Sequence, residues 1–387
     1  MPDVHARLSA SGSHIWLNCT PSIKLSEGIP DRQTEFTLEG TTAHSLAELE
    51  LGKRFKLIKP SEFAPAITKI HSSKWYNAEM DSYIEAYADW VVETYNAIPS
   101  DDKELLTEQR LDFSSWVPGG FGTGDVVIVA DDVLTVIDLK YGKGVPVSAF
   151  QNPQLMLYGL GAYDSFSLSN DISTVRLIIN QPRLDSISEF EISAEDLLKW
   201  GEEYVKPRAA AAAAGEGEAV PGEHCRWCKA NATCKARADA MIEAAKHEFD
   251  DEPRLMTDEE VTHVLSLVDQ IQAWVSDVKD YALKEAERGR VWPGWKLVEG
   301  RANRKYADTA KVEEKLIAAG YDKAVLYKDP ELLGLTAMEK VVGGKKKLEG
   351  LLGELIVKPQ GAPTLVPETD KRPPMDMAAQ AKQDFAE

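Results

Sequence analysis

Two short apolar stretches joined by a two-residue turn constrain the fold of this chain more than any other feature. Residues 124–130 and 133–140 are rich in β-branched and aliphatic side chains, and Asp131 and Asp132 separate them. Strand-forming runs of this length around two turn-forming residues predict a β-hairpin. A further strand is expected at 105–113. The chain therefore has to build a sheet around this hairpin.

Helical periodicity lies on both sides of the predicted strands. We expect helices at residues 13–19, 39–55, 60–98, 149–163 and 194–206, and a fourth strand at 174–180. The alternation predicts an α/β fold, in which a mixed sheet is flanked by helices. The alanine-rich stretch 209–222 is typical of a helix end or a linker.

The C-terminal third has a different pattern. Residues 257–288 predict one long amphipathic helix, and 295–299 resemble a strand. The expected organisation is a core at 1–240 with a helical insertion at 56–104, a long helix and α-rich appendage at 241–357, and a disordered tail at 358–387.

Composition excludes some classes of function. The formal net charge is −19, which argues against a protein that coats DNA non-specifically but permits an enzyme that grips DNA in one groove. No apolar run reaches the roughly 18–20 residues that cross a bilayer. Residues 1–17 lack the basic and apolar regions of a signal peptide. We therefore expect a cytoplasmic protein without membrane contacts.

Three charged residues at the hairpin predict chemistry. Asp138 and Lys140 point to one face of their strand because residues two apart do so, and the hairpin brings Asp125 beside Asp138. Two neighbouring carboxylates favour a hard divalent cation such as Mg²⁺ or Mn²⁺ between them. The alternative is structural, with Asp125 in a turn and the other two residues in a strand-end ion pair.

The chain has four cysteines, at positions 19, 225, 228 and 234. Disulfides are unusual in the expected compartment, so three closely spaced cysteines with one distant partner indicate a metal or cluster site. Four thiolates suit an iron–sulfur cluster or Zn²⁺, and the spacing does not separate them. Four unrelated buried thiols are the remaining alternative.

Asp125 with Asp138-Leu139-Lys140 resembles the motif of PD-(D/E)XK nucleases. Gln154 and Tyr158 resemble the QxxxY motif of the RecB-like branch, and residues 40–44 resemble its GxxxH helix. The resemblance implies a restriction-endonuclease-like core with helical insertions. It also implies a Mg²⁺- or Mn²⁺-dependent deoxyribonuclease, most simply an exonuclease. Aspartate at position 138 replaces the more frequent glutamate, which affects the expected metal geometry.

The resemblance assigns roles to individual residues. The implied catalytic residues are Asp125, Asp138, Lys140, Gln154 and Tyr158. The implied metal ligands are His44, Asp125, Asp138 and the backbone carbonyl of Leu139, with Glu108 as an auxiliary ligand. Lys143, in a Gly/Lys loop, and Gln151, three residues before Gln154, are the expected DNA contacts.

The cysteines resemble those of RecB-like nucleases in which Cys19, Cys225, Cys228 and Cys234 would hold a [4Fe–4S] cluster, with Zn²⁺ as the alternative. Residues 180–186 and 295–305 resemble an uncharacterised phage-encoded family. The implied partners are DNA and phage replication or recombination proteins in the host cytoplasm. Two other functions stay open: a non-catalytic DNA- or partner-binding protein on a nuclease scaffold, and a structural subunit of a replication complex. Residues 343–345 lack the spacing of a Walker A motif, so any helicase motor is a separate protein.

Overall fold

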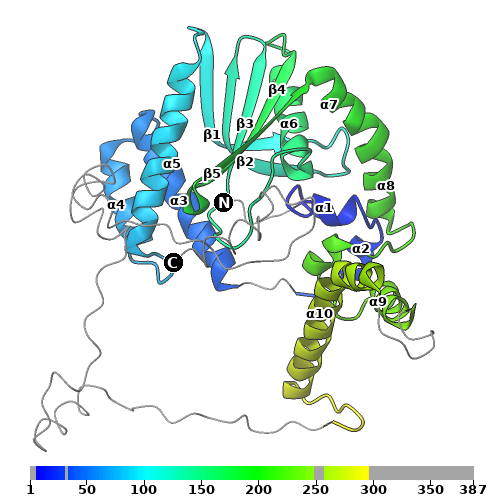
Figure 1. Cartoon of the computed structure of the whole chain (residues 1–387). Helices are drawn as coiled ribbons and strands as arrows, with labels where there is room; N and C mark the ends of the chain where they lie inside the picture. Colours follow the sequence, from blue (N-terminus) through cyan, green and yellow to red (C-terminus); the bar gives the residue numbers. More distant parts are fainter. Residues whose placement is uncertain (1–5, 31–33, 248–256, 296–387) are drawn as a thin grey trace, which may run out of the picture. The chain divides into compact units, whose positions relative to one another are not determined.

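A five-stranded sheet forms the centre of the protein (Figure 1). The computed structural model describes residues 6–30, 34–247 and 257–295. The strands lie in the order β1 (Lys103–Asp112), β2 (Phe121–Ala130), β3 (Val133–Leu139), β4 (Thr174–Gln181) and β5 (Ser186–Ser193). Strands β3 and β4 are parallel, and the other neighbours are antiparallel. The fold is therefore mixed α/β, as predicted.

Helices flank the sheet. The described α-helices are α1 (Ser13–Trp16), α2 (Ser22–Leu25), α3 (Glu35–Arg54), α4 (Pro60–His71), α5 (Ala78–Ala97), α6 (Pro153–Phe166), α7 (Ala194–Trp200), α8 (Lys206–Ala214), α9 (Lys235–His247) and α10 (Asp258–Glu287). Shorter turns are η1 (Pro182–Leu184), the π-helical η2 (Gly201–Val205) and η3 (Glu223–Trp227). Helix α6 connects the parallel strands β3 and β4, as a crossover must.

Each face of the sheet has its own apolar core. Val127 and Val129 on β2 belong to the cluster that α1, α6, α7 and α8 complete, whereas Val126 and Ile128 pack in the cluster of α3 and α5. Burying such a side chain contributes roughly 1.5–3 kcal/mol. A one-residue slip of β2 would exchange the two sets, so burial on both faces fixes the register and thereby the position of Asp125.

The edge strand β5 was absent from the sequence-based prediction. It pairs with β4, and its alternate residues are half-buried and exposed. Phe190 and Ile192 alternate with Glu189 and Glu191, which is the period of a strand covered on one face. The sequence therefore contains the alternation of a strand at β5, but over only a few residues.

Several helix boundaries also differ from the prediction. The stretch 60–98 forms two helices, because Asn77 starts α5 by accepting a hydrogen bond from the Met80 N–H at 3.1 Å. The alanine-rich stretch is helical as far as Ala214, where Gly215 at φ +69° ends α8.

The chain divides into two units, Met1–Arg290 and Val291–Glu387. The first includes the long helix α10, which has no buried residue. From residue 296 on, the predicted α-rich appendage, its strand-like segment and the tail lie outside the described residues. No described helix combines the length and apolarity needed to span a bilayer.

Candidate metal and acid–base site

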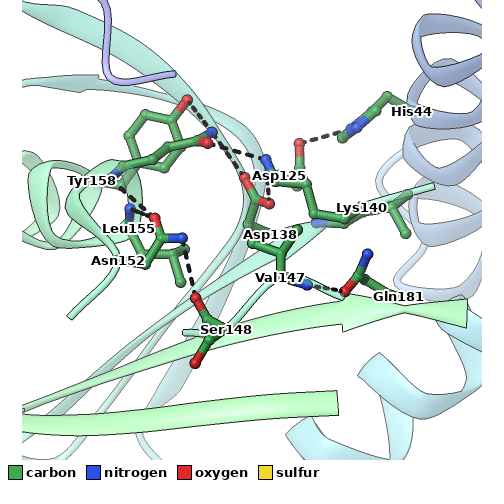
Figure 2. Close-up of polar contacts among 12 residues, drawn as sticks. His44, Asp125, Asp138, Lys140, Val147, Ser148, Asn152, Leu155, Tyr158 and Gln181 are labelled. Carbon is green, nitrogen blue, oxygen red and sulfur yellow. Dashed lines mark hydrogen bonds and ion pairs between the residues drawn. The ribbon is translucent and has the colours of Figure 1, made fainter. Parts of the chain in front are cut away.

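An imidazole and two carboxylates converge beside the middle of β2. Ligand atoms of His44, Glu108 and Asp125 all lie within 4.8 Å of one another. In the part of the chain that the structure describes, no other group of three or more His, Cys, Asp or Glu residues is this close. His44 Nδ1 is 3.0 Å from Asp125 Oδ1 (Figure 2). Sequence reasoning named all three residues, and they come from α3, β1 and β2.

The pairing of β1 with β2 is interrupted at Glu108 and Asp125. Between the pairs Thr107–Val126 and Gln109–Gly124, the β1–β2 ladder omits Glu108 and Asp125. Glu108 has φ +49°, a left-handed conformation that costs a non-glycine residue about 1–3 kcal/mol and is concentrated at functional sites. The N–H of Leu139 donates to Asp125 Oδ2 at 2.7 Å, so β3 holds this carboxylate in place.

A second polar group lies beside the first. Lys140 Nζ is 2.8 Å from Asp138 Oδ2 and donates to Gln154 Oε1 at 3.1 Å. Gln154 Nε2 in turn donates to Asp138 Oδ1 at 3.1 Å and to the Tyr158 hydroxyl at 3.4 Å. The strand spacing of two and the helix spacing of four therefore place these side chains together, as the sequence predicted.

The carboxylate of Asp138 is only 6% exposed. Its Oδ2 lies 2.8 Å from the ammonium of Lys140, and no other donor reaches the atom within the described residues. A buried carboxylate oxygen in this state retains capacity for another cation or a water molecule. Asp138 does not belong to the group of three ligands, although both lie at one cavity.

The charges in the site perturb one another. Burial acts to lower the pKa of His44, but attraction to Asp125 and their hydrogen bond outweigh it and raise this pKa to about 9. Burial acts to raise the pKa of Asp125, yet His44 holds it below its ordinary value. Burial raises the pKa of Asp138, with Lys140 opposing and Asp125 reinforcing the shift. Burial and repulsion from Asp125 raise the pKa of Glu108 to about 7.

These residues line an open cavity of about 810 Å³, a volume that includes solvent at its mouth. The sequence did not identify several of its other lining residues, namely Ala6, Ser9, Ala10, Ser11, Phe121, Gly122 and Thr123. A Cβ atom on Gly122 would lie 2.6 Å from Tyr158 Cε1, so glycine there leaves room for the tyrosine ring.

Two expected DNA contacts lie elsewhere. Lys143 is exposed in the loop after β3 and does not line the acidic cavity. Gln151 lines a different cavity, because it precedes α6 with φ +49° and the helical spacing that placed it beside Gln154 does not apply. Asn152 caps α6 and Pro153 is its first residue, which is a sequence signal for the helix start.

All four cysteines line one small cavity, together with Ser22 and Asn231. Ser22 Oγ and Asn231 Oδ1 are buried and lack hydrogen-bond partners within the described residues. Burial raises the pKa of the Cys228 thiol. No three cysteine sulfurs of this cavity meet the 4.8 Å spacing that His44, Glu108 and Asp125 satisfy, so the thiols share a cavity without forming a close cluster.

Comparison with known proteins gives matches to solved structures and to a protein family. A solved structure titled "Crystal structure of SSO0001" is 16% identical, and the match covers 58% of this chain and 96% of that one with a TM-score of 0.23. Residues 5–373 match the family described as "Protein of unknown function (DUF2800)". The chain therefore belongs to the DUF2800 family.

Proposed function

We propose that this protein is a metal-dependent DNA nuclease with a RecB-like PD-(D/E)XK core. The observation that carries the proposal is the juxtaposition of His44, Glu108 and Asp125 with the Asp138–Lys140 ion pair at one cavity. Carboxylates, an imidazole and an ammonium group in this arrangement match the needs of phosphodiester hydrolysis.

The donor set fits a hard divalent cation. One nitrogen and carboxylate oxygens within 4.8 Å of one another suit Mg²⁺ or Mn²⁺, and Asp138 Oδ2, which is paired with Lys140, offers a further oxygen at the same cavity. The carbonyl of Leu139 stays a predicted ligand. A divalent ion bound there would polarise the phosphodiester and lower the pKa of a water molecule.

The remaining side chains have roles that follow from their contacts. Lys140 keeps its positive charge, because Asp138 outweighs burial and raises the pKa of the lysine, and it can offset charge on a phosphate. Gln154 contacts both Lys140 and Asp138 and therefore fixes their orientation. Tyr158 orients Gln154 from the next turn of α6.

The cysteine cavity is proposed to hold a [4Fe–4S] cluster. A single Zn²⁺ bound at about 2.3 Å by four thiolates would hold their sulfurs about 3.8 Å apart. The cysteine sulfurs in the described residues do not approach one another this closely in groups of three. A cubane cluster is larger than one ion and separates its thiolates further. Cys19 and the three later cysteines would then be linked across the core.

The proposed substrate is DNA, and the proposed setting is phage recombination or replication, with exonucleolytic resection as the reaction. A non-catalytic binding protein on the same scaffold is the competing function. The buried Asp138–Lys140–Gln154 network favours catalysis, because a site that only binds DNA needs no buried carboxylate beside its ammonium group.

The test is digestion of DNA labelled at its 5′ or 3′ end by anaerobically purified protein with Mg²⁺ or Mn²⁺. We expect degradation that Asp138→Ala and Lys140→Ala abolish, while Lys69→Ala, exposed on α4 and outside the cavity, leaves most of it. Equal degradation by the wild type and the two site variants would reject the site, and absence of degradation by the wild type would favour the binding protein.

A further inference from the structure

A second cavity lies on the other side of α6 from the acidic site. It encloses about 950 Å³, including solvent at its mouth, and its main lining residues are Leu17, Met156, Phe190, Ile192, Trp200 and Tyr204. These come from the region after α1 and from α6, β5, α7 and η2. Helix α6 contacts α1 and α7, and α7 contacts β5 and η2. Asn18 and Gln151 add polar groups to the apolar wall.

Flat groups are stacked at this cavity. The rings of Trp200 and Tyr204 are 6.3 Å apart and inclined by 19°, and the guanidinium of Arg208 lies 4.0 Å from the centroid of Tyr204 on the same helical segment. Arg208 has no ion pair within the described residues. Phe190 lines the same cavity and packs edge-on against the exposed Phe150. Aromatic faces beside an uncompensated cation suit a planar, anionic ligand.

The backbone at this cavity is irregular in two places. Trp200 and Tyr204 lie on either side of the α7–η2 junction, where the helix changes to π-helical hydrogen bonding, and such turns are frequent at functional sites. Gln151 has φ +49°, a conformation that surrounding structure has to maintain against strain. Both irregularities open onto the same cavity.

The two cavities share a helix. Gln154 and Tyr158 face the acidic cavity, whereas Pro153 and Met156 line the aromatic one. The two cavities thus lie on different faces of α6, and a polynucleotide with one phosphate at the acidic site would pass around this helix to place bases in the second cavity. A duplex keeps its bases stacked and paired, so only unpaired bases are available to aromatic side chains.

We propose that the cavity lined by Phe190, Trp200 and Tyr204 binds nucleobases of single-stranded DNA, with Arg208 contacting the adjacent phosphate. This rests on the proposed function and specifies its substrate as a single strand or a single-stranded end. Stacking on aromatic rings is tolerant of sequence, so the site selects for unpaired bases and not for a base type.

The test measures fluorescence anisotropy of a labelled oligothymidylate of about 16 nucleotides, in buffer without Mg²⁺ or Mn²⁺ so that no cleavage occurs. We expect Trp200→Leu and Tyr204→Leu each to weaken binding by about tenfold, and Trp200→Phe to restore much of it. Trp227→Leu is the matched control, because Trp227 is 60% exposed and has Arg226 5.2 Å from its ring but lies outside the cavity. Binding of a blunt duplex should not change.

Photocrosslinking of wild-type protein to an oligonucleotide with halogenated uracil avoids dependence on variants that fail to fold. Crosslinks at Trp200, Tyr204 or Phe190 support the site. Unchanged affinity of folded Trp200→Leu, or crosslinks elsewhere, overturns it. Degradation of DNA by the wild type with no effect of Trp200→Leu would reject this inference alone, whereas a wild type that neither binds nor degrades DNA would reject the proposed function as well.

Discussion

Replacement of Lys140 with methionine should separate metal binding from catalysis and measure the buried ion pair. The ammonium lies 2.8 Å from Asp138 Oδ2, and the carboxylate is 6% exposed while the lysine side chain is 29% exposed. Removing one partner of a fully buried pair costs about 3–5 kcal/mol, and an exposed pair contributes less than about 1 kcal/mol. The intermediate exposure of Lys140 places the expected loss at about 2 kcal/mol.

The loss should depend on pH and on Asp138. Burial raises the pKa of Asp138 above its ordinary value. Protonation therefore removes the uncompensated charge, and the stability deficit of Lys140→Met should shrink as pH falls through this raised pKa. Adding Asp138→Asn to Lys140→Met removes the charge at every pH and should recover most of the stability.

Thermal unfolding followed by circular dichroism measures both effects, and about 2 kcal/mol corresponds to a melting temperature lowered by roughly 4–8 °C. Calorimetric titration should show Mn²⁺ binding that is unchanged or slightly tighter, because His44, Glu108 and Asp125 are intact, while DNA cleavage is lost. A melting temperature of Lys140→Met equal to that of the wild type would contradict this prediction. So would a double variant with Asp138→Asn that is no more stable than Lys140→Met.

Three further predictions concern His44, Gly122 and the Arg237–Asp277 ion pair. Because the pKa of His44 is raised to about 9, Mn²⁺ has to displace a proton from this imidazole at neutral pH. The affinity for Mn²⁺ should therefore increase as pH rises towards 9, and calorimetry in buffers of different ionisation enthalpy should detect the released proton. Gly122→Ala puts a Cβ 2.6 Å from the Tyr158 ring and should reduce cleavage more than Tyr158→Phe, measured as initial rates on one substrate. Arg237 is 4% exposed and lies 2.6 Å from the carboxylate of Asp277. Asp277→Asn removes this charge partner and should lower the free energy of unfolding by about 1–2 kcal/mol. Adding Arg237→Met to Asp277→Asn should restore part of this loss, measured by thermal unfolding.

The part of the site that sequence reasoning predicted rests on short-range periodicity. The hairpin register pairs Val126 with Ile137, so Asp125 and Asp138 come next along their strands. Spacing of two along β3 and of four along α6 then brings Lys140 and Gln154 together. Local geometry of this kind depends on few residues and is fixed by burial of the strands on both faces.

Other features depend on contacts or backbone angles that no local pattern contains. The left-handed conformation of Glu108 has no signal in its residue type. Ser9 and Ser11 reach the acidic cavity because the segment before α1 shares an apolar core with α6, which brings distant parts of the chain together. The position of Gln151 could have been predicted from the sequence. Asn152 and Pro153 are typical of a helix start, so Gln151 lies before α6 and not on its face.

The most direct test of the central claim is anomalous scattering from crystals soaked in Mn²⁺. We expect a peak within coordination distance, about 2.1–2.3 Å, of His44 and Asp125, with Glu108 or Asp138 completing the protein ligands. A crystal that binds Mn²⁺ only elsewhere, or that leaves these side chains in their ion-paired arrangement at saturating Mn²⁺, would contradict it.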